Sequence, residues 1–387
     1  MDKTIKKEYA IFVLLISIGI FLRFLVMSLG YNYDWESYCI VGKIFSNLGN
    51  VYAETNRYNY GMIFFCIQGL LYRISQIKPD SYEIIYRVLM VVTLTLADFG
   101  ITFYIAKKFS LRKALIFFLN PISIIITGYH NQFDYIAISL ALLTLVFYNE
   151  EEKFNKKDVG FVLTFALCLM TKHILFMLPI FLLLKNGLCW KKKIVYACCP
   201  PFLFLLSFVP FAIGNEAALQ GIINNVFLYR SYNNAPLFIL VYNLIDFPSG
   251  LRIYVYLGMM ILTAVITRKL IYEKQLLLYL IAMVAFSSAI ANQYLAIPLV
   301  ALCVLSLEWF RNIYMIIIGA YLIFHSSGLG AMSRIQEFMP EPIGKLLEYF
   351  VRRGYIVAAW ILFLALIYEL FLNKRLKVKK AADAQIE

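Results

Sequence analysis

The stretch MDKTIKKEYAIFVLLISIGIFLRFLVM (residues 1–27) decides the class of fold. Three lysines precede an apolar run long enough to cross the hydrocarbon core of a bilayer, which takes about 20 helical residues. No small-residue cleavage pattern follows the run, so we expect an uncleaved membrane helix over about residues 9–29 rather than a signal peptide. The lysines predict a cytoplasmic N-terminus, because basic residues concentrate on that side of a membrane.

The composition of the whole chain extends this signal. Of its 387 residues, 62% are hydrophobic and 15% are charged, whereas a soluble protein is about half apolar and a quarter charged. The net charge of +13 comes from Lys and Arg clusters between apolar runs, which is typical of orientation signals and leaves no soluble basic domain for nucleic acid. No Asn-x-Ser/Thr acceptor occurs, which favours a bacterial plasma membrane. The sequence predicts an all-α polytopic membrane protein with a single integral membrane domain over residues 1–387.

Segment lengths and basic clusters together predict the topology. The apolar run 61–74 covers about 14 residues and about 21 Å, which is too short for a span. We therefore expect it to lie at the outer interface as an amphipathic helix of a first external loop, residues 31–83. The other apolar runs then alternate as about twelve spans, with a second large external loop at 214–250. Both termini, including the basic tail 373–387, are predicted to be cytoplasmic.

This topology places a set of polar side chains together on the outer face. Ionisable groups at the ends of lipid-buried helices are costly unless they face water, a partner or a ligand. Their convergence on one side therefore predicts an outward-facing polar cavity. The candidate site residues are Asp34, Glu36, His130, Gln132, Asp134, Lys172, His173, Arg230, Gln293 and Tyr294.

Each candidate also has a structural alternative. Asp34 fits a solvated loop acid at a helix exit, and Glu36 fits a charge in the first turn of the following helix. His130 and Asp134 are four residues apart, on one face of a helix start, where Asp134 fits an N-terminal helix acid. Lys172 fits a structural pairing with a nearby carboxylate.

Asp98 lies well inside a predicted span and is not a site candidate. An ionised carboxylate in the membrane needs a partner. We therefore expect Asp98 to form a hydrogen bond from one helix to another.

Four stretches, in chain order, resemble the GT-C superfamily of polyprenyl-phosphate-sugar-dependent glycosyltransferases. After Asp34, GNVYAETNRYNYG (49–61) resembles the first-loop pattern of the family. LNPISIIITGYHNQFDYIAISLAL (119–142) resembles the Asn-Pro and His-x-Gln segment of dolichyl-phosphate-glucose glucosyltransferases and the Asn-Pro…Asp segment of GPI mannosyltransferase I. MTKHILFMLPIFLL (170–183) is similar to the Lys-His-Ile…Pro stretch of those glucosyltransferases, and SSAIANQYLAIPL (287–299) to the Ser-Gln-Tyr region of the mannosyltransferase.

The resemblance implies a GT-C-like helical bundle and an inverting glycosyltransferase. It would move a hexose from a polyprenyl-phosphate sugar to a lipid-linked glycan or cell-envelope polymer on the outer face. Asp34 would be the catalytic base, and Lys172, Arg230 or an arginine of the segment 334–353 would hold the phosphate. The other candidates would bind substrate.

Two further expectations concern metal use and an alternative function. We expect no obligatory cofactor or metal, since a prenyl monophosphate carries less charge than a nucleotide diphosphate, although Asp34 with Glu36 leaves a divalent ion open. The alternative function is a transporter or flippase of lipid-linked sugars. Transporters usually show internal repeats, and none is visible in the sequence.

Overall fold

The computed structural model describes residues 3–229, 235–330 and 339–372, and this part of the chain forms helices and no strands. The first half contains α1 (Lys3–Ser28), α2 (Asp34–Ser46), α3 (Val51–Glu54), α4 (Met62–Ser75), η1 (Pro79–Ser81), α5 (Tyr82–Lys108), α6 (Leu111–Phe118), α7 (Pro121–Gly128), α8 (Asp134–Phe147), α9 (Lys156–Thr171), η2 (His173–Leu175) and α10 (Leu178–Leu184). The second half contains α11 (Trp190–Leu206), α12 (Val209–Ala212), α13 (Glu216–Gly221), η3 (Ile222–Phe227), α14 (Ile239–Leu244), η4 (Ser249–Leu251), α15 (Arg252–Thr267), α16 (Tyr272–Ala285), η5 (Asn292–Ala296), α17 (Leu299–Val304), α18 (Glu308–His325), α19 (Ser327–Gly330), α21 (Glu341–Arg352), α22 (Gly354–Ile367) and η6 (Tyr368–Leu372).

Several of these helices have the length and apolar composition of a membrane span. In the described residues there are five, and up to seven if each of two bent helix pairs counts as one span. The all-helical class is confirmed, and the spans fit a membrane protein. Residues 3–229, 235–330 and 339–372 do not supply twelve helices of spanning length, because several predicted spans are short or broken. The five helices are Tyr9–Ser28, Pro79–Lys108, Trp190–Ala212, Ser249–Thr267 and Gly354–Phe371.

Two pairs of helices are bent at a break, and the local sequence explains one of the two breaks. Between α6 and α7 the direction changes by 48° at Asn120-Pro121. Proline cannot continue the hydrogen-bond ladder of α6, but it fits the first position of a new helix. The Asn120 side chain accepts from the Ile122 amide and caps α7. The second break, of 112°, follows α9 at Lys172, whose backbone is extended.

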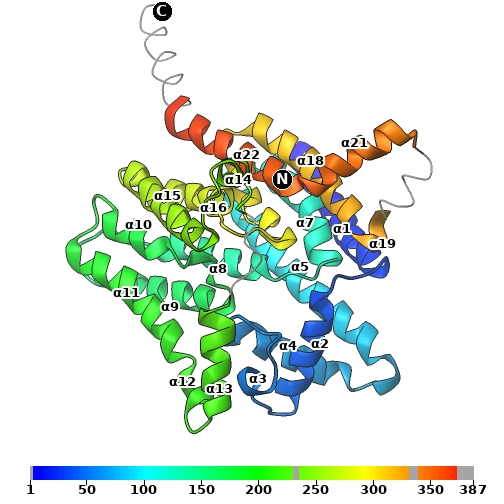
Figure 1. Cartoon of the computed structure of the whole chain (residues 1–387), viewed down its shortest axis with the longest axis horizontal. Helices are drawn as coiled ribbons and strands as arrows, with labels where there is room; N and C mark the ends of the chain where they lie inside the picture. The colour runs from blue at the N-terminus through cyan, green and yellow to red at the C-terminus, as the bar shows by residue number, and fades with distance from the viewer. Residues whose placement is uncertain (1–2, 230–234, 331–338, 373–387) are drawn as a thin grey trace, which may run out of the picture.

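The helices of the predicted first external loop gather at one end of the molecule, where α2, α3 and α4 lie near α12 and α13 (Figure 1). The Asn50 side chain donates to the Phe211 carbonyl at 2.8 Å, and the Tyr52 ring packs edge-on against Phe211. The first predicted external loop therefore packs against α12, which directly precedes the second predicted external loop, residues 214–250. The basic tail 373–387 lies outside the described residues.

Candidate functional site

The site is built where the chain leaves α1 and α7, because these two helices pack closely. A Cβ on Gly128 would come within 2.4 Å of the Arg23 carbonyl oxygen, so a residue without a side chain is needed at this crossing. The segments that follow the two helices, 29–34 and 129–133, consequently emerge beside each other.

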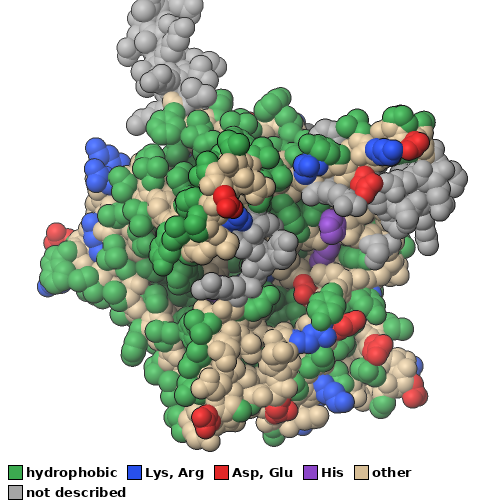
Figure 2. All heavy atoms as spheres, in the orientation of Figure 1, with side chains coloured by type: hydrophobic (Ala, Val, Ile, Leu, Met, Phe, Trp, Pro, Cys, Tyr) green, Lys and Arg blue, Asp and Glu red, His purple; other side chains and the backbone are tan. Residues whose placement is uncertain are grey.

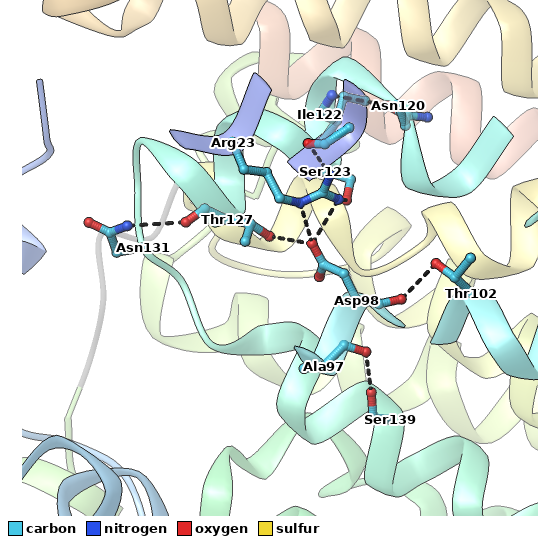
Figure 3. A network of polar contacts seen from close by, with 11 residues as sticks. Arg23, Ala97, Asp98, Thr102, Asn120, Ile122, Ser123, Thr127, Asn131 and Ser139 are labelled. Atoms are coloured by element: carbon cyan, nitrogen blue, oxygen red, sulfur yellow. Dashed lines mark hydrogen bonds and ion pairs between the residues drawn. The ribbon is translucent and has the colours of Figure 1, made fainter. Parts of the chain in front are cut away.

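A buried polar network fixes the crossing (Figure 3). Arg23 of α1 donates to Asp98 of α5 at 2.8 Å, and both side chains are fully buried. Arg23 also donates to Ser123 of α7 at 2.9 Å, and Thr127 donates to Asp98 at 2.9 Å. The network joins three helices, so the predicted helix-to-helix hydrogen bond of Asp98 is confirmed. Its partner Arg23 was not predicted from the sequence.

Asp34 is the first residue of α2, at the end of the loop after α1, and its side chain is half-buried. Its carboxylate accepts from the Gln132 side-chain amide and from Asn32 Nδ2 at 3.2 Å. Within the described part of the chain Asp34 forms no ion pair. Both of its side-chain donors are neutral amides, whereas Asp98 also accepts from the charged Arg23.

His130 belongs to the same polar cluster. Asn32 Nδ2 also donates to His130 Nδ1 at 3.1 Å. The proton of a neutral imidazole then sits on Nε2, which donates to Ser326 Oγ at 3.1 Å. Burial and the nearby charge of His325 lower the His130 pKa to about 4, so the ring is neutral at physiological pH.

The expectation that His130 and Asp134 share one helix face is wrong. α8 begins only at Asp134, and His130 lies in the preceding loop. Asn131 takes a left-handed backbone conformation, with φ of 53°, and its side chain donates to the carbonyls of Thr127 and Gly128. Asn tolerates that conformation, and His130 contacts Asn32 rather than a residue of α8.

Asp134 and Lys172 form a second buried ion pair. Asp134 is the N-terminal acid of α8, as its structural alternative predicted, and Lys172 Nζ lies 2.8 Å from its carboxylate. At most 2% of either side chain is exposed. The ammonium also lies 4.7 Å from the Phe133 ring centre and 5.7 Å from that of Tyr294. The structural alternative for Lys172, pairing with a carboxylate, is what the structure shows.

The other predicted site residues have separate surroundings. Glu36 is 56% exposed and faces Arg57 at 3.5 Å, in the first turn of α2 as expected. The His173 ring lies 5.8 Å from that of Tyr60. Gln293 belongs to η5 and lines the same pocket as Asp34. Arg230 lies outside the described residues.

A pocket of about 380 Å³ opens beside Asp34, within the size range of about 300–1,000 Å³ typical of small-ligand sites. Among its lining residues in the described part of the chain Asp34 is the one carboxylate, and most of the others offer imidazoles, amides, phenols or a hydroxyl. Histidine and acidic side chains are visible on the same face of the molecule (Figure 2). The pocket is lined by Tyr31, Asn32, Tyr33, Asp34, Tyr129, His130, Ala291, Asn292, Gln293, His325, Ser326 and Tyr355.

Three of these lining residues, Asp34, His130 and Gln293, are site candidates predicted from the sequence, and the rest are not. The sequence does carry a signal for Asn32. It stands two residues before Asp34, where an Asn side chain can form a local hydrogen bond to the carboxylate. Tyr355 comes from the start of α22 and donates to Asn292 at 2.7 Å. No sequence signal connects these two residues.

Two further searches, for a metal site in the described residues and for similar proteins, gave no match. No group of three or more His, Cys, Asp or Glu that could hold a metal ion occurs in residues 3–229, 235–330 and 339–372. Comparison with protein-family models, curated proteins and solved structures found no match for this chain.

Proposed function

We propose that this chain is an inverting glycosyltransferase of GT-C type, which moves a hexose from a polyprenyl-phosphate sugar to a lipid-linked glycan or cell-envelope polymer. One observation carries the proposal. Within the described part of the chain, Asp34 is the carboxylate that lines the polar pocket, and neutral amides rather than a cation bind it. Such a carboxylate is free to accept a proton from a substrate hydroxyl.

The proposed reaction is a single displacement. Asp34 takes the proton of an acceptor hydroxyl as its oxygen attacks the anomeric carbon of the donor. The bond from that carbon to the phosphate oxygen breaks, and its electron pair leaves with the prenyl phosphate, so the anomeric configuration inverts. Gln132 and Asn32 hold the carboxylate in position, and positioning of this kind lowers the entropic part of the barrier.

The remaining pocket side chains suit a sugar ligand. Amides and phenols, such as those of Asn292, Gln293 and Tyr355, donate to and accept from hydroxyl groups. The predicted phosphate contact of Lys172 has little support, because Asp134 already balances its charge. We therefore propose that Arg230 or an arginine of the segment 334–353 binds the phosphate. Arg230 and residues 334–338 lie outside the described residues.

The proposed orientation places the pocket on the outer side of the plasma membrane, with about twelve crossings of the chain. A single cysteine at Leu48, which is 87% exposed in the first loop, should react with an impermeant thiol reagent in intact cells. A cysteine at exposed Lys153 should not. The measurement uses a variant without the seven native cysteines. External labelling at Lys153 with protection at Leu48 would reverse the orientation.

The activity itself is tested with purified protein and a series of prenyl-phosphate hexoses. We expect free prenyl phosphate to be released when a lipid-linked glycan acceptor is present, and the same rate in excess EDTA. Loss of turnover in EDTA would show that a metal is required. Passage of lipid-linked sugar across a vesicle membrane without release of prenyl phosphate would replace the enzyme proposal with a transporter.

A further inference from the structure

A second cavity lies far along the chain from the Asp34 loop, on the outside of the helical bundle. It is a groove of about 670 Å³ between α5 and α8, which pack against each other. Its walls are mostly apolar, and some of the apolar side chains face outward, including Phe103, which is 69% exposed, and Val146, which is 59% exposed. In a membrane protein such a surface faces lipid.

The groove has one polar end. Lys107 and Lys108, at the C-terminal end of α5, line it beside Val146 near the end of α8. The opposite end is formed by Gly100 and Ser139. From residue 100 to residue 108 a helix rises about 12 Å, which is close to half of the hydrocarbon core of about 30 Å. The groove therefore runs from a basic membrane edge to near the bilayer centre.

The charges at this end favour an anion. Lys108 pairs with Glu273 at 2.8 Å and remains 46% exposed. Lys107 is exposed and has no ion pair among the described residues, and the same holds for Arg112 in the first turn of α6. An ammonium has three donors, so Lys108 can bond a phosphate without leaving Glu273. Basic pockets between membrane helices on the cytoplasmic side bind anionic headgroups.

We propose that the α5–α8 groove binds an anionic phospholipid. One acyl chain lies between α5 and α8, and the phosphate contacts Lys107 and Lys108. This site is separate from the Asp34 pocket. It rests on the proposed orientation, in which this edge is cytoplasmic, and not on the proposed enzyme activity.

The test is native mass spectrometry of the full chain in detergent, titrated with phosphatidylglycerol or phosphatidylcholine that carry the same acyl chains. A basic residue near a lipid phosphate is worth about 1 kcal/mol, or about fivefold in affinity. We expect phosphatidylglycerol to bind at least about fivefold more tightly, and Lys107→Gln to remove most of that preference. Lys153→Gln, another exposed lysine without an ion pair in the described chain, is the matched control and should change the affinity less than twofold.

A second variant tests the groove rather than the charge. Leu143→Trp adds bulk to an exposed groove side chain, 40% exposed, and should weaken binding of both lipids while the protein stays folded. Equal binding of the two lipids, an equal loss in Lys107→Gln and Lys153→Gln, or unchanged binding in Leu143→Trp would each overturn the proposal.

Discussion

Asp34 and Asp98 are two aspartates of one chain with opposite environments. Asp98 lies in the middle of α5, fully buried, with Arg23 at 2.8 Å. Asp34 stands at the start of α2, half-buried beside a pocket, and receives hydrogen bonds from Gln132 and Asn32. The first carboxylate is bound to a fixed cation, whereas the second is held only by neutral groups.

The partners of a carboxylate decide whether it can act as a base. A buried carboxylate paired with a cation cannot take a proton without leaving that cation uncompensated, which is costly. A carboxylate held by amides keeps its position and can still accept a proton. Asp134, paired with Lys172, belongs with Asp98. Gly128 and the Arg23 network hold α1 and α7 together, beside the loop that leads to Asp34.

The largest expected effect comes from Asp34→Asn. The amide keeps the size of the side chain but cannot take the proton, and a general base contributes about 10² to 10⁴ in rate. We expect release of prenyl phosphate to fall by about a hundredfold or more, with near-normal donor binding.

Glu36→Gln is the matched control, two residues away in the same helix. Its contact with Arg57 is long and exposed, and such pairs are worth about 0.2–1 kcal/mol. We expect its turnover to change less than about fivefold. An inactive Glu36→Gln beside a normal Asp34→Asn would mean that Glu36 is the base.

Removing a partner of the buried pair should act on stability. Arg23→Ala leaves Asp98 charged without its cation, and breaking a buried pair costs about 3–5 kcal/mol in free energy of unfolding. Unfolding in a detergent titration measures the loss. The double variant Arg23→Met with Asp98→Leu replaces both charges by apolar groups and should recover most of it. Equal stability of Arg23→Ala and the wild type would show that the pair is not structural.

A smaller effect concerns pH and His130. Its pKa is lowered from 6.5 to about 4 in the folded chain, so the unfolded chain binds a proton there first as pH falls. The contribution of His130 to stability is fully present above pH 6.5 and is lost between pH 6.5 and about 4. His130→Gln should therefore lose less stability across this range than the wild type. Parallel curves of melting temperature against pH for the two proteins would contradict the assignment.

The class of fold could be predicted from the sequence because apolar runs and basic clusters are local signals. The number of spans could not, since helix breaks such as the one at Lys172 depend on tertiary contacts. There the ammonium is held by Asp134 and faces the rings of Phe133 and Tyr294. An apolar run does not show whether its helix is straight or bent by 112°.

The candidate site was predictable in part for a similar reason. Asp34, His130 and Gln293 are polar groups that follow apolar runs, so position alone indicated them. Ser326 and Tyr355 close the pocket from distant parts of the chain, and a single sequence does not contain that pairing. The spacing of four residues suggested that His130 and Asp134 share one helix face. A left-handed turn at Asn131 lies between them instead, and the spacing alone does not show it.

The most direct test of the account measures two properties of two variants, Asp34→Asn and Asp98→Asn. For each, the free energy of unfolding and the release of prenyl phosphate per folded molecule are determined on the same preparation. We predict that Asp34→Asn stays within about 0.5 kcal/mol of wild-type stability and loses turnover about a hundredfold. Asp98→Asn should lose about 3–5 kcal/mol and keep most of its turnover. Normal turnover in Asp34→Asn would contradict the central claim that this carboxylate is the catalytic base.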